Sequence, residues 1–124
     1  MPDRTTTISL TGSLAAAAAP GAVVVARWLL VSHSPFPVAA NVYVRTTPAP
    51  LAGLACKGGR TQVGRFHGSV LVALEPRAVA TIVALVGPVD DGDLCLRATA
   101  VTDGDEAQAD LVTCVGRIAE AGAA

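Results

Sequence analysis

The sequence predicts an all-β fold, an immunoglobulin-like antiparallel sandwich of seven to eight strands. Turn-forming pairs of Pro, Gly and Asp recur at short intervals, and strand-length runs rich in Val and Leu lie between them. Several of these runs alternate apolar and polar residues, as antiparallel strands with one buried face do. The sequence contains no stretch with convincing helix caps. Together these observations favour a sandwich over any helical fold.

The expected strands lie between these turn signals. Their ranges are 5–10, 23–31, 39–46, 61–65, 69–74, 78–86, 94–101 and 110–118. Alternation assigns one face of three of these strands to the core. The residues expected to point inward are Val24, Ala26, Trp28, Leu30, Val42, Val44, Leu94, Leu96, Ala98 and Ala100. The residues expected to point outward are Arg27, Asn41, Tyr43, Arg45, Arg97 and Thr99.

The composition limits the kind of core and of surface. Hydrophobic residues make up 52% of the chain but aromatic residues only 3%, so the core must be built from Val, Leu, Ala and Ile. Charged residues make up 15%, against about a quarter in ordinary domains. This deficit indicates that neighbouring subunits cover part of the surface. The length predicts one domain over 1–124, with a core at about 8–118 and short terminal arms.

Charge and hydropathy exclude two classes of partner. The net charge is −1 and the nine basic residues are scattered, so we expect no nucleic acid partner. The apolar stretch 14–30 is interrupted by Pro20-Gly21 and by Arg27. It is therefore too broken for a membrane span or an export signal, and we expect no membrane insertion.

Short motifs along the chain match a known pattern. They are Pro20-Gly21, His33-Ser34-Pro35, Ala40-Asn41-Val42-Tyr43-Val44, Leu51-Ala52-Gly53-Leu54, the stretch from Leu74-Glu75-Pro76-Arg77 to Thr81, and the stretch from Ala98 to Asp103. Over roughly 10–115 the chain resembles the conserved-repeat Ig-like domains of bacterial surface proteins, related to the CARDB adhesion domains. His33 stands where that family prefers Asn, and Arg77 where it prefers Gly. The resemblance implies a spacer or adhesion role rather than catalysis.

The triplet Ser32-His33-Ser34 raises the question of a nucleophile with its base. Adjacent residues on an extended chain point apart, and the sequence places no third partner near them. Pro35 and Pro37 force the residues before them toward extended geometry. We therefore expect a loop that joins two strands.

The other histidine and the glycine-rich turn are weak candidates for chemistry. His67 lacks a nucleophile-elbow pattern, and Gly68 is expected to permit a turn or a bulge before the next strand. His33 and His67 without carboxylates make a poor metal site. The run Cys56-Lys57-Gly58-Gly59-Arg60 could form an anion-binding turn or an activated thiolate, but a glycine turn with solvated cations is the simpler interpretation.

Two acidic clusters look like calcium loops. They are Asp90-Asp91-Gly92-Asp93 and Asp103-Gly104-Asp105-Glu106, and they flank one expected strand, so they lie too far apart to share an ion. Neither has an EF-hand ligand order, and we interpret both as solvated hairpin turns.

Three cysteines, Cys56, Cys95 and Cys114, are too few for a disulfide scaffold or a zinc site. A regular hairpin centred near Gly104-Asp105 would place Cys95 opposite Cys114. A disulfide between them would be strained in that geometry, and two reduced thiols are the favoured alternative.

No set of residues supplies a nucleophile, a base and an oxyanion site together, so we predict a non-enzyme with no catalytic, cofactor-binding or metal-binding residues. The first interpretation is a virion or particle-surface protein, a capsid accessory or decoration subunit that contacts capsid or surface-assembly subunits. In it, the arms 1–7 and 119–124 would contact a neighbour. Whether these arms pair within or between chains, and whether the chain forms homo-oligomers, stays open.

The alternative is a bacterial cell-surface or adhesion module, or a fibre subunit that assembles by strand addition. A third interpretation, a sugar- or ion-binding sandwich, needs an aromatic platform. The sequence offers few aromatic residues for it: Trp28, Phe36, Tyr43 and Phe66.

Overall fold

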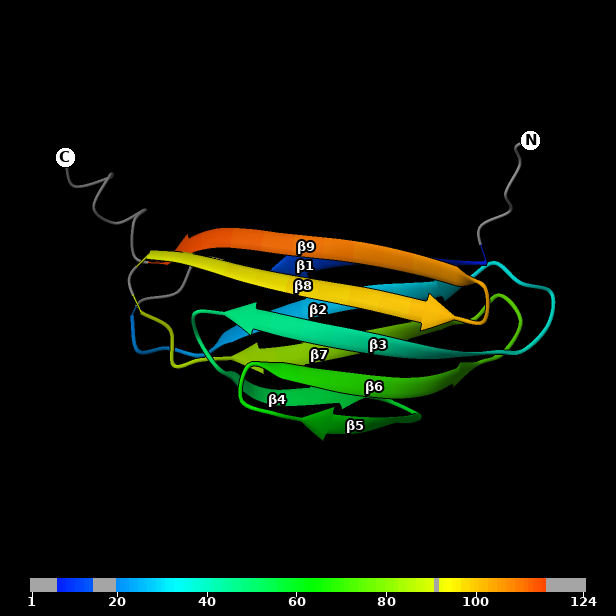
Figure 1. The fold of residues 1–124 in the computed structure, drawn as a ribbon, viewed down its shortest axis with the longest axis horizontal. Helices are drawn as coiled ribbons and strands as arrows, with labels where there is room; N and C mark the ends of the chain where they lie inside the picture. The colour runs from blue at the N-terminus through cyan, green and yellow to red at the C-terminus, as the bar shows by residue number, and fades with distance from the viewer. Residues whose placement is uncertain (1–6, 15–19, 91, 116–124) are drawn as a thin grey trace.

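The computed structural model describes residues 7–14, 20–90 and 92–115, and they form two antiparallel sheets packed face to face (Figure 1). The four-stranded sheet has the order β1-β2-β7-β4 and the five-stranded sheet the order β5-β6-β3-β8-β9. The strands are β1 Ile8–Leu14, β2 Val24–Ser32, β3 Val38–Thr47, β4 Leu51–Cys56, β5 Gly59–Val63, β6 His67–Leu74, β7 Val79–Val86, β8 Gly92–Thr102 and β9 Asp105–Val115. The predicted all-β, Ig-like sandwich is confirmed.

The described residues contain no helix, and therefore none long and apolar enough to cross a membrane.

The structure has one strand more than the sequence predicted. The missed strand is β4, whose residues lie between the expected strands 39–46 and 61–65. Its sequence, LAGLAC, contains two Ala and a Gly, which are poor strand formers. It lies at the edge of its sheet, pairs only with β7, and has an irregular register between Leu51 and Gly53. Strand β9 begins at Asp105 rather than at 110, because the turn before it spans only Asp103-Gly104.

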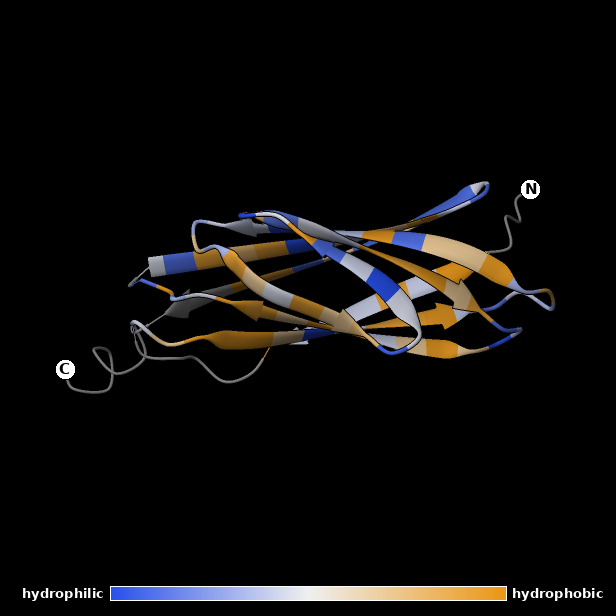
Figure 2. Cartoon of the chain, turned by 90° about the horizontal axis from the view of Figure 1, so that it is seen from below, coloured by the Kyte–Doolittle hydropathy of each residue, from blue (hydrophilic) through white to orange (hydrophobic). Residues whose placement is uncertain are grey.

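Alternation along the strands builds the core (Figure 2). The inward faces predicted for β2, β3 and β8 are all buried, and the residues predicted to point outward are not. Trp28 is wholly buried, with 0% of its surface exposed. It lies between Gly12 of β1 and Ile82 of β7 in the register of the sheet. A Cβ on Gly12 would lie 2.7 Å from Cδ1 of Trp28, so this glycine makes room for the indole.

The edges of the two sheets lie close together. Strand β1 lies beside β9, and β4 lies beside β5 (Figure 1). At the first of these edges, the Asp105 carboxylate accepts hydrogen bonds from the backbone N–H groups of Thr7 at 2.7 Å and of Ile8 at 3.2 Å. Thr7 also accepts the His33 N–H at 2.8 Å. Thr7 thus pairs within its own domain, whereas residues 1–6 lie outside the described residues.

Two turns hold the end of the five-stranded sheet in place. The Thr46 hydroxyl donates a buried hydrogen bond of 2.8 Å to the Ala49 carbonyl, which fixes the connection from β3 to β4. The turn between β5 and β6 is anchored on both sides, because its carbonyls at Phe66 and Arg65 accept the N–H groups of Thr46 at 2.9 Å and of Leu51 at 2.7 Å. This end of the sheet carries the groove described below.

Candidate binding surfaces

The triplet Ser32-His33-Ser34 lies where β2 of one sheet crosses to β3 of the other, as the sequence predicted. The Ser32 hydroxyl is buried and accepts the Ser34 N–H at 3.3 Å. The Ser34 hydroxyl accepts the Phe36 N–H at 3.0 Å. Both serines therefore hold the loop in shape, and neither contacts the imidazole.

His33 does contact a serine that the sequence analysis did not identify. Its Nε2 lies 3.0 Å from the hydroxyl oxygen of Ser9 on β1. The contact follows from the pairing of Ile8 with Ser32, a tertiary relation that sequence spacing does not show. Among the described residues no carboxylate hydrogen-bonds to His33. The pair is exposed and lacks the orienting group that a triad needs.

Gly68 has a different role from the one expected. It lies inside β6, paired with Val44 and Val63 in an unbroken register, so the predicted turn or bulge is wrong. A Cβ at this position would lie 2.8 Å from Cδ2 of Leu51 and 2.9 Å from the carbonyl of Gln62. A glycine is required here because β4 and β5 pack directly over the backbone.

The predicted glycine turn is confirmed at Lys57-Gly58, where it joins the unpredicted strand β4 to β5. Burial raises the pKa of the half-buried Cys56 thiol above its ordinary value. This direction is opposite to the one that an activated thiolate beside Lys57 and Arg60 would need.

We expect iodoacetamide to alkylate Cys56 more slowly in the folded chain than in urea at the same mildly alkaline pH. The raised pKa leaves less thiolate at any given pH, and burial limits access. Peptide mapping by mass spectrometry distinguishes Cys56 from the other thiols. The folded state favours the neutral Cys56 thiol. Its contribution to the free energy of unfolding is therefore fully present below the ordinary thiol pKa and is lost as the pH rises through the pKa of Cys56 in the folded chain. Equal rates in both states would contradict this assignment.

The two acidic clusters have different positions in the fold. Asp103-Gly104 is the turn of the β8–β9 hairpin, as predicted. The Asp105 carboxylate binds the backbone N–H groups of Thr7, Ile8 and Glu106, which commits its oxygens to the protein. Asp90 and Asp93 lie at the crossover from β7 to β8, which belong to different sheets, so the hairpin interpretation is wrong there. Asp91 lies outside the described residues.

The expected position of Cys95 opposite Cys114 in the last hairpin is also wrong. Cys95 lies opposite Val112, and Cys114 lies opposite Asp93. Cys95 is an exposed free thiol. The two-residue turn Asp103-Gly104 moves the centre of the hairpin by one residue, and that change displaces every cross-strand partner by two.

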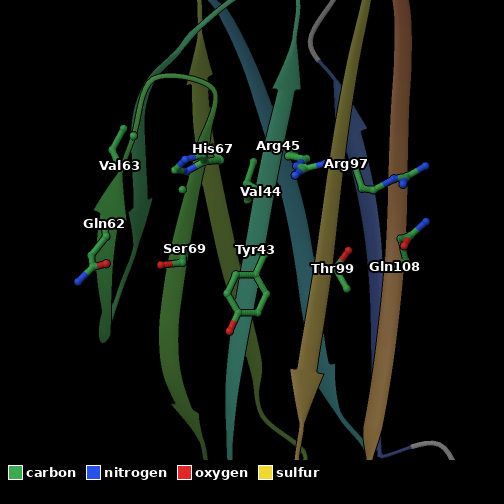
Figure 3. Close-up of a pocket in the computed structure, with 12 residues that line it drawn as sticks. Tyr43, Val44, Arg45, Gln62, Val63, His67, Ser69, Arg97, Thr99 and Gln108 are labelled. Atoms are coloured by element: carbon green, nitrogen blue, oxygen red, sulfur yellow. The ribbon is translucent and has the colours of Figure 1, made fainter.

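The outer face of the five-stranded sheet carries a groove of about 760 Å³ (Figure 3). One row of hydroxyl and amide side chains crosses all five strands of this face. This polar row consists of Gln62, Ser69, Tyr43, Thr99 and Gln108, each the cross-strand neighbour of the next. Tyr43 lies at its centre and is 51% exposed (Figure 3). The groove is therefore lined by hydrogen-bonding groups around one exposed ring.

A basic row lies next to the polar row. It consists of His67, Arg45, Arg97 and Asp110, again as successive cross-strand neighbours. Arg97 is paired with Asp110 through its Nε at 3.1 Å and its Nη2 at 3.3 Å. Among the described residues no carboxylate forms an ion pair with Arg45. The two arginines are cross-strand neighbours, and the Asp110 carboxylate offsets the charge of Arg97 but, in the part of the chain that the structure describes, forms no ion pair with Arg45.

The outer face of the four-stranded sheet is apolar along its centre, whereas the edge strand β1 presents Ser9, Thr11 and Ser13 on this side. The two inner strands, β2 and β7, point six aliphatic side chains outward: Val25, Leu29, Val31, Val79, Val83 and Leu85. Leu29 is 45% and Val79 57% exposed. Arg27 is the one charged residue within β1, β2, β4 and β7. We call this surface the apolar face.

No protein-family model and no curated protein matches the sequence. Solved structures do match the fold. The CARDB domain of the PF1109 protein from Pyrococcus furiosus has a TM-score of 0.64 at 12% identity over 87% of this chain and 91% of its own. The chain has the fold of a CARDB-like sandwich. The predicted resemblance is thus supported at the level of structure.

Two further structures share the fold with this CARDB-like sandwich. The C-terminal domain of the Streptococcus pyogenes antigen I/II-family protein AspA has a TM-score of 0.69 at 11% identity over 90% of this chain, which spans 47% of that domain. The bacterial hydrophobin BslA has a TM-score of 0.57 at 11% identity over 91% and 98% of the two chains.

Two local features can be compared with the pattern of the CARDB-like sandwich. Arg77, where the family pattern has Gly, has a φ of 61°, the left-handed conformation that glycine adopts at least cost. The CARDB domain of PF1109 was solved with two metal ions. In the described part of this chain no three His, Cys, Asp or Glu side chains come together as metal ligands would.

Proposed function

We propose that the chain is a non-enzymatic, Ig-like module of a bacterial surface protein and that it works through protein–protein contacts made by the apolar face. This was the alternative interpretation of the sequence. Its fold neighbours are surface-associated β domains, which favours it over a virion decoration subunit. The observation that carries the proposal is a sheet face with six outward aliphatic side chains and a single charge, Arg27.

Contacts through this face explain the low content of charged residues. Strand addition, in contrast, needs a free sheet edge. The edge at β1 is partly used, because Asp105 binds the N–H groups of Thr7 and Ile8 there and β9 lies alongside. The edge strand β5 is only five residues long and carries Arg60, features that discourage edge pairing. These features of β1 and β5 favour association face to face over strand addition at those two edges.

The partner that the apolar face fits is a like face on a second copy of the chain. Four strands about 4.8 Å apart and eight residues long give a face of about 500 Å². Two such faces would remove about 1,000 Å² from water, which is at the lower limit for a specific interface. Among the described residues this face contains no carboxylate that would be left unpaired. The long side chain of Arg27 can extend toward the rim of the interface.

Sedimentation velocity over a concentration series tests this proposal. We expect the wild-type chain to associate reversibly at high micromolar concentration, and the double variant Leu29→Lys, Val79→Lys to stay monomeric at an unchanged melting temperature. Leu71→Lys is the matched control, because Leu71 is 46% exposed on the outer face of the opposite sheet. A monomeric wild type, or equal disruption by the control, would overturn the proposed interface. A separate experiment tests the surface location: intact source cells are treated with an external protease, which should cleave the chain if it lies on the cell surface.

A further inference from the structure

We propose that the groove on the five-stranded sheet is a binding site for a carboxylated glycan, with Tyr43 as its platform and Arg45 as the partner of the carboxylate. The site lies on the opposite side of the sandwich from the apolar face, so it goes beyond the proposed function. It rests on the polar row and the basic row, which lie next to each other across the sheet.

The shape of the groove fits an extended, flexible chain of hydroxyl-bearing rings. The polar row crosses five strands at about 4.8 Å spacing, so it is about 19 Å long. Its side chains both donate and accept hydrogen bonds, as the hydroxyl groups of a sugar do. Figure 3 shows Gln62 and Ser69 on one side of Tyr43, and Thr99 and Gln108 on the other. A ligand that lies along the row would meet polar groups over its whole length.

Of the few aromatic residues that the sequence offers for a sugar platform, Tyr43 is the one that lines this groove. A sugar site needs an exposed aromatic face, and Trp28 is unsuitable because it is wholly buried. Phe66 lies outside this groove and carries the Arg65 guanidinium 5.4 Å from its ring centroid. Tyr43 is the aromatic residue that lines the groove. Its ring can pack against the apolar side of a pyranose while its hydroxyl stays available for hydrogen bonds.

The basic row indicates that the ligand carries negative charge. Arg45 lies between His67 and Arg97 as a cross-strand neighbour of both. Arg97 is already neutralised by Asp110, so Arg45 is the guanidinium that can take a carboxylate in a two-pronged hydrogen bond. The His67 ring lies against Gly64, since a Cβ on this glycine would be 2.6 Å from the ring Cε1. A uronic acid chain combines this charge with the hydroxyl groups that the polar row needs.

Titration of the isotope-labelled full chain with a short oligogalacturonate, followed by NMR, tests the proposal. We expect saturable shifts at Tyr43, Arg45 and Thr99. We expect Arg45→Gln to weaken the affinity at least about tenfold, since a hydrogen bond to a charged group contributes about that much to binding. Tyr43→Ala should also weaken the affinity, because it removes the ring that packs against the pyranose. Binding should also weaken as salt is added.

Two controls make the test specific. Arg27→Gln removes the same charge from the apolar face and should leave the affinity unchanged. The methyl ester of the same oligosaccharide keeps its hydroxyl groups, lacks the charge, and should bind at least about tenfold more weakly. The proposal is overturned by absence of binding, by equal loss in Arg27→Gln and Arg45→Gln, or by equal affinity for free phosphate. None of these outcomes depends on the association of the apolar face, which the Leu29→Lys, Val79→Lys variant tests.

Discussion

Replacing Trp28 by alanine is expected to destabilise the fold by about 3–5 kcal/mol. The indole is wholly buried between the two sheets and lies opposite Gly12 and Ile82 in the pairing of β1, β2 and β7. Most of the surrounding core is aliphatic and rigidly held, so the cavity would collapse only in part. Urea unfolding should be followed by circular dichroism, because Trp28 is the only tryptophan in the chain.

Two further variants separate burial from the polar group of the indole. Leu29→Ala changes the next residue, which points outward from β2, and should cost less than about 1 kcal/mol. Trp28→Phe should retain most of the stability, because in the described part of the chain the buried Nε1 has no hydrogen-bond partner. Removing that N–H offsets part of the lost packing. A loss in Trp28→Ala no greater than in Leu29→Ala would refute this account of the core.

The inward and outward faces of the strands could be predicted because they depend only on alternation. The face that carries Trp28 and the outward position of Tyr43 both followed from a period of two. Strand β4 could not be predicted in the same way. Its Ala and Gly residues have weak strand preference, and it is held by pairing with β7 and by the turn at Thr46 and Ala49. Tertiary contacts therefore decide its conformation.

The composition of the groove could be predicted only in part. Alternation assigned Tyr43, Arg45, Arg97 and Thr99 to the outer surface, but it did not show that they are neighbours. Their side-by-side position depends on β3 lying between β6 and β8 in the sheet, and neither strand is next to β3 in the sequence. The contact of Ser9 with His33 depends in the same way on the pairing of β1 with β2.

We expect Gly87→Ala to cost about 3 kcal/mol, because two penalties act together. Gly87 has a φ of 149°, a conformation that residues with a Cβ rarely adopt, and strain of this kind costs about 1–3 kcal/mol. A Cβ there would also lie 2.7 Å from the carbonyl of Ala22 and 3.0 Å from Cα of Val23. Backbone atoms cannot move aside as a flexible side chain can, so overpacking adds about 1–3 kcal/mol. Unfolding in guanidinium chloride measures the sum.

Gly58→Ala separates the two penalties in Gly87→Ala. Gly58 also has a positive φ, of 78°, but no atom lies within 4 Å of the position that its Cβ would take. This variant should therefore show the conformational cost alone, about 1–2 kcal/mol. An equal loss in both variants would mean that the backbone near Ala22 yields. A larger loss in Gly87→Ala would mean that this contact is rigid. Because the Gly87 N–H donates a 2.9 Å hydrogen bond to the Pro50 carbonyl, that rigidity also holds the start of β4 against β7.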